Sequence, residues 1–214
     1  VCLSCLTMTG CSALNFSVEG LINAPKLTSE QSEIHQALIE SVGSNITLKY
    51  PKNGEYRSAY VIANIDDEPT DEAMVFYEYT SNGSEEDGLR VNILDKDEDG
   101  KWYSVKELAG AGTDIDQVII SPMGSNNQTD VFVGYQNLTN DEKTMEIYSY
   151  TDGDFKRVAL DTYSVLEPLD INNDGYIELI TIQRSTNNDT GAVTAKASML
   201  NMKNNEITRG ENVD

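Results

Sequence analysis

The spacing of apolar residues changes once along the chain, from a helical period to the period of strands. Residues 28–43 predict one amphipathic helix, with Thr28 or Ser29 as its N-cap and Gly43 as its C-cap. The only histidine, His35, lies beside the apolar stripe of this helix, where we expect packing or solvent exposure rather than catalysis. The stripe comprises Ile34, Leu38, Ile39 and Val42.

From Ile46 onward, apolar and β-branched runs of strand length alternate with clusters of Gly, Asn and Asp. The runs fall into units of four, and each unit has a polar loop between its first and second run. The units span residues 58–108, 114–160 and 163–214. An acid immediately precedes the second run of each unit: Glu72, Asp130 and Glu178. The chain therefore predicts a repeat.

Four strands per unit, with a period of about fifty residues, are typical of a β-propeller blade. We therefore expect a mainly β fold in which one amphipathic helix precedes a propeller-like repeat domain over residues 44–214. A sandwich is the alternative, because the same strands can pack as two sheets. Closed propellers have about 4 to 8 blades, so three units predict either a piece of a longer propeller or an open arc covered by the helix.

The loop of the third unit has oxygen-bearing side chains at alternate positions and Gly175 at its bend. Calcium takes six to eight oxygen ligands from carboxylates, amides, backbone carbonyls and water. Loop positions one, three, five and nine are Asp170, Asn172, Asp174 and Glu178, and the carbonyl of Tyr176 is a further candidate ligand. The sequence predicts a structural calcium site here. It is not an EF-hand, because Thr181 occupies position twelve and a strand follows.

The other two units carry weaker versions of this loop. In the first unit the same positions hold Asn64, Asp66, Glu68 and Glu72, and they form a weaker candidate metal site because Pro69 replaces the glycine. In the second unit they hold Pro122, Gly124, Asn126 and Asp130, which offer too few donors.

The stretch from Asp95 to Gly100 also matches a calcium-loop pattern, but it falls between the third and fourth strands of its unit. The third unit has Asn204-Asn205 at that place, and the second has Asp152-Gly153. Asp-Gly supplies the positive φ that a tight hairpin requires. We therefore interpret this stretch as a hairpin turn.

The loop from Asp170 to Glu178, followed by an apolar strand and repeated in β-units, resembles the FG-GAP or VCBS-type repeats of integrin-like propellers and many bacterial surface proteins. The resemblance covers roughly residues 58 to 214 and is specific in the third unit. It implies a calcium-stabilised propeller. It implies no single activity, because such repeats occur in adhesins, lectin-like modules and enzymes.

Composition narrows the choice of partners. Fifteen Lys and Arg against 36 Asp and Glu give a net charge of −21. This charge repels nucleic acid and anionic lipid headgroups. An acidic surface also keeps a secreted protein soluble.

All three cysteines lie in the first eleven residues, at Cys2, Cys5 and Cys11. Residues 1–11 are uncharged, small and apolar, and they end in Thr-Gly-Cys. They resemble the end of a bacterial lipoprotein signal, which implies a lipid on Cys11, a tether over residues 12–27 and a location on the outer face of a bacterial membrane. We expect membrane attachment by this lipid alone. The alternative is a short buried strand with two ordinary cysteines.

Two functions remain open. The first is a non-enzymatic surface module that binds a protein or polysaccharide; it is favoured by the repeat and by the lack of a G-x-S-x-G motif in the sequence. The second is a carbohydrate-active hydrolase or lyase with paired carboxylates, which 36 acids neither favour nor exclude.

Overall fold

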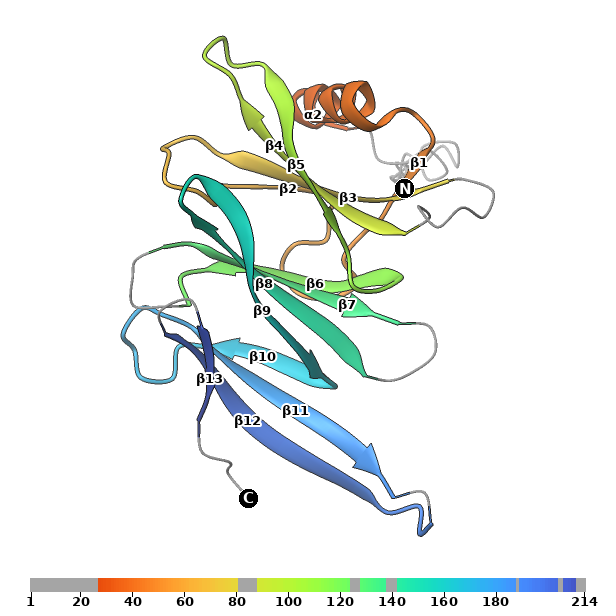
Figure 1. The fold of residues 1–214 in the computed structure, drawn as a ribbon, viewed down its shortest axis with the longest axis vertical. Helices are drawn as coiled ribbons and strands as arrows, with labels where there is room; N and C mark the ends of the chain where they lie inside the picture. Colours follow the sequence, from red (N-terminus) through yellow and green to blue (C-terminus); the bar gives the residue numbers. More distant parts are fainter. Residues whose placement is uncertain are drawn as a thin grey trace, which may run out of the picture.

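A computed structural model gives the fold (Figure 1). It describes residues 27–80, 88–123, 128–137, 142–187, 189–203 and 206–210.

One α-helix, α2 (Ser29–Val42), lies where the apolar period predicts it. Thr28 is the N-cap, and it forms a capping box with Gln31, each accepting at its side chain a hydrogen bond from the backbone N–H of the other. Gly43 ends the helix with a φ of 83°, and its N–H donates to the carbonyl of Ile39. His35 packs edge-on against Tyr60, and its Nδ1 lies 2.8 Å from the Tyr60 hydroxyl.

The rest of the described chain is β, in three antiparallel sheets. Sheet A comprises β1 (Ile46–Leu48), β2 (Tyr60–Ala63), β3 (Glu72–Tyr79), β4 (Leu89–Lys96) and β5 (Trp102–Ala109). Sheet B comprises β6 (Asp114–Ser121), β7 (Asp130–Gln136), β8 (Lys143–Thr151) and β9 (Asp154–Tyr163). Sheet C comprises β10 (Val165–Leu169), β11 (Glu178–Thr186), β12 (Val193–Lys203) and β13 (Glu206–Arg209).

Each predicted four-strand unit is one sheet, in which strands follow one another in chain order. The strand that the sequence did not predict is β1. It extends sheet A to five strands because β3 is long enough to pair twice, with β1 at Tyr77 to Tyr79 and with β2 from Glu72 to Val75.

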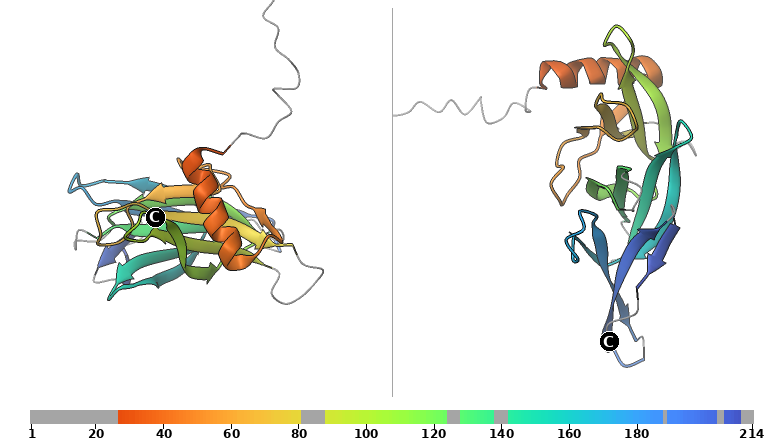
Figure 2. Two further views of the ribbon diagram at one scale, coloured as in Figure 1. Left: turned by 90° about the horizontal axis from the view of Figure 1, so that it is seen from above. Right: turned by 90° about the vertical axis from the view of Figure 1, so that its left-hand side faces the viewer.

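The sheets stack face to face, and α2 covers the free face of sheet A (Figures 1 and 2). Three apolar clusters hold the layers together. Between the helix and sheet A, Ile34 and Leu38 of α2 pack on Val75 and Tyr77. Between sheets A and B, Phe76 and Val91 pack on Val133 and Tyr135. Between sheets B and C, Phe132 and Ile147 pack on Leu179 and Leu200. In the described residues the sheets number three, not the two of a sandwich, and they form no closed barrel or propeller.

The meander order decides which loops lie together. In an antiparallel meander, the connection between strands one and two and the connection between strands three and four lie at the same end of the sheet. The first and third repeat loops and the β4–β5 and β8–β9 hairpins accordingly lie along one flank of the stack, at the left of Figure 1. Separately, no helix among the described residues is long and apolar enough to span a bilayer.

Candidate functional site

The acid that opens the second strand of each sheet has the same local role in all three. Glu72, Asp130 and Glu178 are 2%, 1% and 8% exposed. Each accepts a hydrogen bond from the backbone N–H seven residues earlier: Ile65 to Glu72 at 2.8 Å, Met123 to Asp130 at 3.0 Å and Ile171 to Glu178 at 2.9 Å. Each acid therefore ties the repeat loop to the start of the second strand of its sheet. The sequence analysis did not predict this role, although an apolar residue lies seven positions before the acid in all three loops.

In the third loop the predicted ligands lie together at one turn. Asp170 accepts from the N–H groups of Asp174 and Gly175, at 3.1 and 3.0 Å, and Asp174 accepts from the N–H of Tyr176 at 2.9 Å. The bend occurs at Asn173 and Gly175, whose φ angles are 59° and 90°. Glycine at this position tolerates a positive φ that a side chain would strain.

The amide of Asn172 lies between two of the predicted ligands. Its Nδ2 donates to Asp174 at 3.0 Å and to Glu178 at 3.2 Å. Its Oδ1 accepts from the N–H of Asp174 at 2.9 Å. A 180° turn of the amide would give up that bond and point the oxygen toward the two carboxylates. Carboxylate and amide oxygens are the residue types that calcium takes as ligands. As placed, no three His, Cys, Asp or Glu side chains of the described residues converge to hold a metal ion.

The first loop is held in a different way. Asn64 donates from its amide to the carbonyls of Glu68 and Thr70, so its nitrogen side closes the loop around Pro69. Asp66 accepts from the N–H of Glu68 at 2.7 Å. The pKa of Glu72 is raised to about 7, mainly by burial and also by the neighbouring charges of Asp66 and Asp95, against the lowering effect of the Ile65 N–H.

In the second loop Asp130 also accepts a hydrogen bond from the hydroxyl of Ser149. Gly124 and Asn126 lie outside the described residues, as does Cys11. The Asp95–Gly100 stretch is the β4–β5 hairpin, as predicted: Gly100 has a φ of 76°, and the Asp97 carboxylate accepts from the N–H groups of Asp99 and Lys101.

A cleft of about 560 Å³ lies between sheets B and C. Its walls are the first strands of the two sheets, β6 and β10, and the segment 53–56 closes one end. Apolar residues line it, among them Ile119, Val165 and Leu166, and its polar groups include Glu55, Gln117, Lys143 and Glu167. This cleft is a second candidate site, and sequence analysis did not identify it.

Asp116 organises one end of the cleft. It is 2% exposed and accepts from Asn53 and Lys143, both at 2.8 Å, and from the Tyr163 hydroxyl at 2.6 Å. Burial raises the pKa of this carboxyl, but the hydrogen bonds outweigh burial, so the pKa lies below its ordinary value. A polar pair inside an apolar strand, Asp116-Gln117, was the sequence signal for this buried hub.

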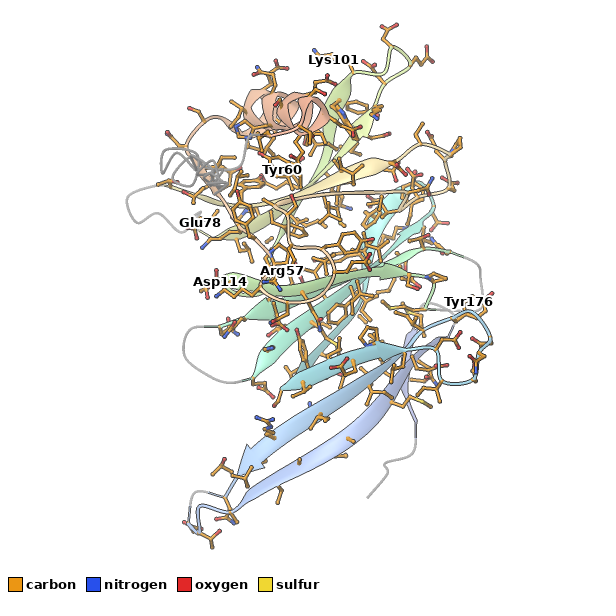
Figure 3. All side chains as sticks on the ribbon, turned by 180° about the vertical axis from the view of Figure 1, so that it is seen from behind. Arg57, Tyr60, Glu78, Lys101, Asp114 and Tyr176 are labelled. Carbon is orange, nitrogen blue, oxygen red and sulfur yellow. The ribbon has the colours of Figure 1, made fainter. Side chains whose placement is uncertain are left out.

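The segment before the cleft adds to the edge of β6. The N–H groups of Lys52 and Asn53 donate to the carbonyls of Ile115 and Asp116, at 3.1 and 2.7 Å. Beyond Asp116, no strand of the described residues pairs with this edge, because β6 is the first strand of sheet B. In Figure 3, Asp114 at the start of β6 and Tyr176 of the third loop lie on opposite sides of the stack, and Arg57 lies between them.

A scan against models of protein families found no match for this chain, and a search of curated proteins found none either.

Proposed function

We propose that the protein is a non-enzymatic binding module, an open arc of three propeller-like blades that holds an extended polypeptide segment of a partner protein in the cleft between β6 and β10. The single observation that carries this proposal is the cleft itself, 560 Å³ in volume and framed by two edge strands. Edge strands offer unpaired backbone N–H and C=O groups to an incoming strand.

The chain already uses this mode of pairing on itself. Residues 52–53 add to β6 through two backbone hydrogen bonds, and the free edge continues from Gln117 into the cleft. A partner segment in extended conformation would continue that pairing, and its alternate side chains would meet Ile119 of β6 and Val165 and Leu166 of β10.

The charges of the cleft favour a basic segment. Glu55 and Glu167 are exposed at its rim, and the only cation in its lining, Lys143, is bound to Asp116. The net charge of −21 also raises the association rate of cationic partners. The lowered pKa of Asp116 keeps it ionised as a structural acceptor, which is the opposite of what a general acid needs. For this reason we propose a binding module and not a hydrolase or lyase that uses paired carboxylates.

The same proposal places the protein on a bacterial surface. The third loop supports kinship with FG-GAP or VCBS-type repeats and a structural calcium ion at Asp170, Asn172, Asp174, Tyr176 and Glu178. The first eleven residues support a lipid on Cys11, which labelling with a palmitate analogue would test, since the Cys11→Ser variant should take up no label.

The cleft is tested by probing the purified protein with an array of extended decapeptides and an array of glycans. We expect peptides rich in Lys or Arg and in β-branched residues to bind, and the double variant Glu55→Lys/Glu167→Lys to lose at least tenfold in affinity. The matched control is Glu98→Lys/Asp99→Lys in the β4–β5 hairpin, which makes the same charge change away from the cleft. Equal losses in both variants, or glycan binding without peptide binding, would contradict the proposal.

A further inference from the structure

A second pocket lies between sheets A and B, on the flank that carries the repeat loops. Its volume is about 190 Å³. That corresponds to about six water molecules at roughly 30 Å³ each, which is too small for most metabolites and suited to one side chain. Its walls come from the first repeat loop, the β4–β5 strands and the β8–β9 hairpin.

The pocket holds an acid pair that the other two sheets lack. In sheet A, Ala73 pairs with Leu94, so the next residues across the two strands are Glu72 and Asp95. The corresponding partner of Asp130 in sheet B is Ser149, whose hydroxyl donates to it. Sheet A thus sets a second carboxylate where sheet B has a hydrogen-bond donor.

In sheet C, as in sheet B, the residue opposite the acid carries no charge. Leu179 pairs with Leu200, so Asn201, an amide, comes opposite Glu178. Like charges directly opposite each other on a sheet are destabilising. Placing Asp95 opposite Glu72 is therefore the exception among the three sheets, and it needs a positive partner.

The described residues supply no such partner. Glu72 is 2% exposed and lines the pocket, and its Oε1 has no hydrogen-bond partner among the described residues. Asp66, Glu68 and Asp95 also line the pocket. None of the four forms a salt bridge with a described residue. A buried carboxylate oxygen without a donor costs free energy that a bound cation would recover.

The only cation in the lining is already engaged. Lys106 Nζ contacts the Asp154 carboxylate and the Phe155 carbonyl, both at 2.6 Å. The negative charges of Asp66, Glu68, Glu72 and Asp95 therefore have no cation of the pocket lining to neutralise them. The ion pair also illustrates the ligand, because Lys106 carries an ammonium group held by a carboxylate and a backbone carbonyl in this same pocket.

The remaining walls are aromatic and aliphatic. Tyr103, Tyr150 and Phe155 line the pocket together with Ile93 and Val105. Aromatic faces attract organic cations, and aliphatic walls bury the methylene groups that carry them. The carboxylates are also spread out, since no three of the described acids converge to chelate a metal ion. A group with several N–H donors on an aliphatic stem matches this arrangement better than a bare ion does.

From this geometry we infer that the pocket between sheets A and B binds an organic cation, an ammonium or guanidinium group on an aliphatic chain. Such a group comes either from a free amine or from a lysine or arginine side chain of another protein. Its charge would lie between Glu72, Asp66 and Asp95, and its stem would lie against Tyr103 and Tyr150. This inference does not depend on the cleft between sheets B and C, which lies on different strands.

The test is an NMR titration of the ¹⁵N-labelled full chain with agmatine, cadaverine, a capped Gly-Lys-Gly peptide and a capped Gly-Arg-Gly peptide. We expect saturable shifts of the amides of Ile65, Val105 and Gly153. The Asp95→Ser variant, which copies the partner residue of sheet B, should lower the affinity at least tenfold. The control Asp99→Ser makes the same charge change at the hairpin tip and should bind like the wild type.

The arms of the titration separate the sources of the cation. Tighter binding of the peptides identifies a side chain of a partner, and tighter binding of agmatine or cadaverine identifies a free amine. A second variant, Glu72→Gln, keeps an acceptor for the Ile65 N–H and should also lose binding, so the result does not rest on the folding of one variant. Saturation by CaCl₂ with no response to any amine would overturn the inference, as would equal responses in Asp95→Ser and Asp99→Ser.

Discussion

Asp116 and Glu72 are both 2% exposed, yet their pKa values move in opposite directions. Asp116 receives hydrogen bonds from Lys143, Tyr163 and Asn53, which favour the ionised form. Glu72 receives one backbone N–H and faces other acids, so burial prevails and its pKa rises to about 7. Burial raises the pKa of both carboxyls, and the number of hydrogen-bond donors around each decides whether its pKa ends above or below the ordinary value.

Glu72 should make folding stability depend on pH near neutrality. Its pKa in the folded protein is about 7, above the ordinary 4.5. Its contribution to stability is therefore full below pH 4.5 and is lost as the pH rises through about 7. Relative to Glu72→Gln, the wild type should lose about 2 kcal/mol of unfolding free energy across this range, less than the full shift gives because the pocket admits solvent.

Urea denaturation at a series of pH values measures this difference. Glu98→Gln, in the exposed β4–β5 turn, is the control and should run parallel to the wild type. A wild-type curve parallel to that of Glu72→Gln would contradict the assignment.

At this scale the sequence located the acids but not their roles. The sequence shows the register of Glu72, Asp130 and Glu178, and it predicts Glu72 and Glu178 as metal ligands at loop position nine but no site at Asp130. Their shared role as backbone acceptors depends on how each loop folds back on its sheet. The difference between Glu72 and Asp130 depends on the residue across the strand, Asp95 or Ser149, which is distant in sequence and follows only from strand register.

Among the elements, the third repeat loop is the one whose conformation a calcium ion would fix. Its carboxylates now accept backbone N–H groups or share the amide of Asn172. An ion that binds only the folded loop stabilises the protein in proportion to the logarithm of its concentration.

Calcium at about one hundred times its Kd should therefore add about 2.7 kcal/mol. This corresponds to a rise in Tm of about 5 °C or more for a chain of this size. The Asp174→Ala variant should show no rise, and the control Asp99→Ala in the β4–β5 hairpin should respond like the wild type. Melting curves that coincide with calcium and with chelator would exclude a calcium site in this loop.

The helix and the strands of the repeat were predictable because each carries its own periodic apolar run. The strand β1 was not, because Ile46–Leu48 is too short to show alternation and forms only by pairing with the far end of β3. The cleft was not predictable for a similar reason. Its walls, β6 and β10, belong to different sheets, and only the stacking brings them together.

For the molecule as a whole, the helix α2 acts as the outermost layer. Leu38 and Ile34 are fully buried against sheet A. The sequence predicted the repeat and a covering helix, but it left the number of sheets in the stack and their closure open. The number of sheets and the closure of the stack depend on how the faces of neighbouring sheets pack on each other. The sequence of a single repeat does not determine that packing.

Leu38→Ala should destabilise the whole molecule by about 3 kcal/mol, because it leaves a cavity between the helix and sheet A. Denaturant unfolding monitored by Trp102, which lies in the same apolar cluster, would measure the loss. Val193→Ala is the control, since Val193 is 66% exposed, and it should change stability by less than about 0.5 kcal/mol. A loss of similar size in both variants would mean that the helix is not part of the cooperative core.

The position of α2 gives the stack a direction. At one end the helix covers sheet A, and at the other end the described residues place nothing on the outer face of sheet C, where Ile180, Ile182 and Met199 are half-buried (Figure 1). If two copies met through that face, each would present a helix at its far end, and growth would stop at a pair. An endless fibre needs two complementary open faces on every copy. In such a pair the helix of each copy would cover the only other sheet face that the described residues offer, and no third copy could add there.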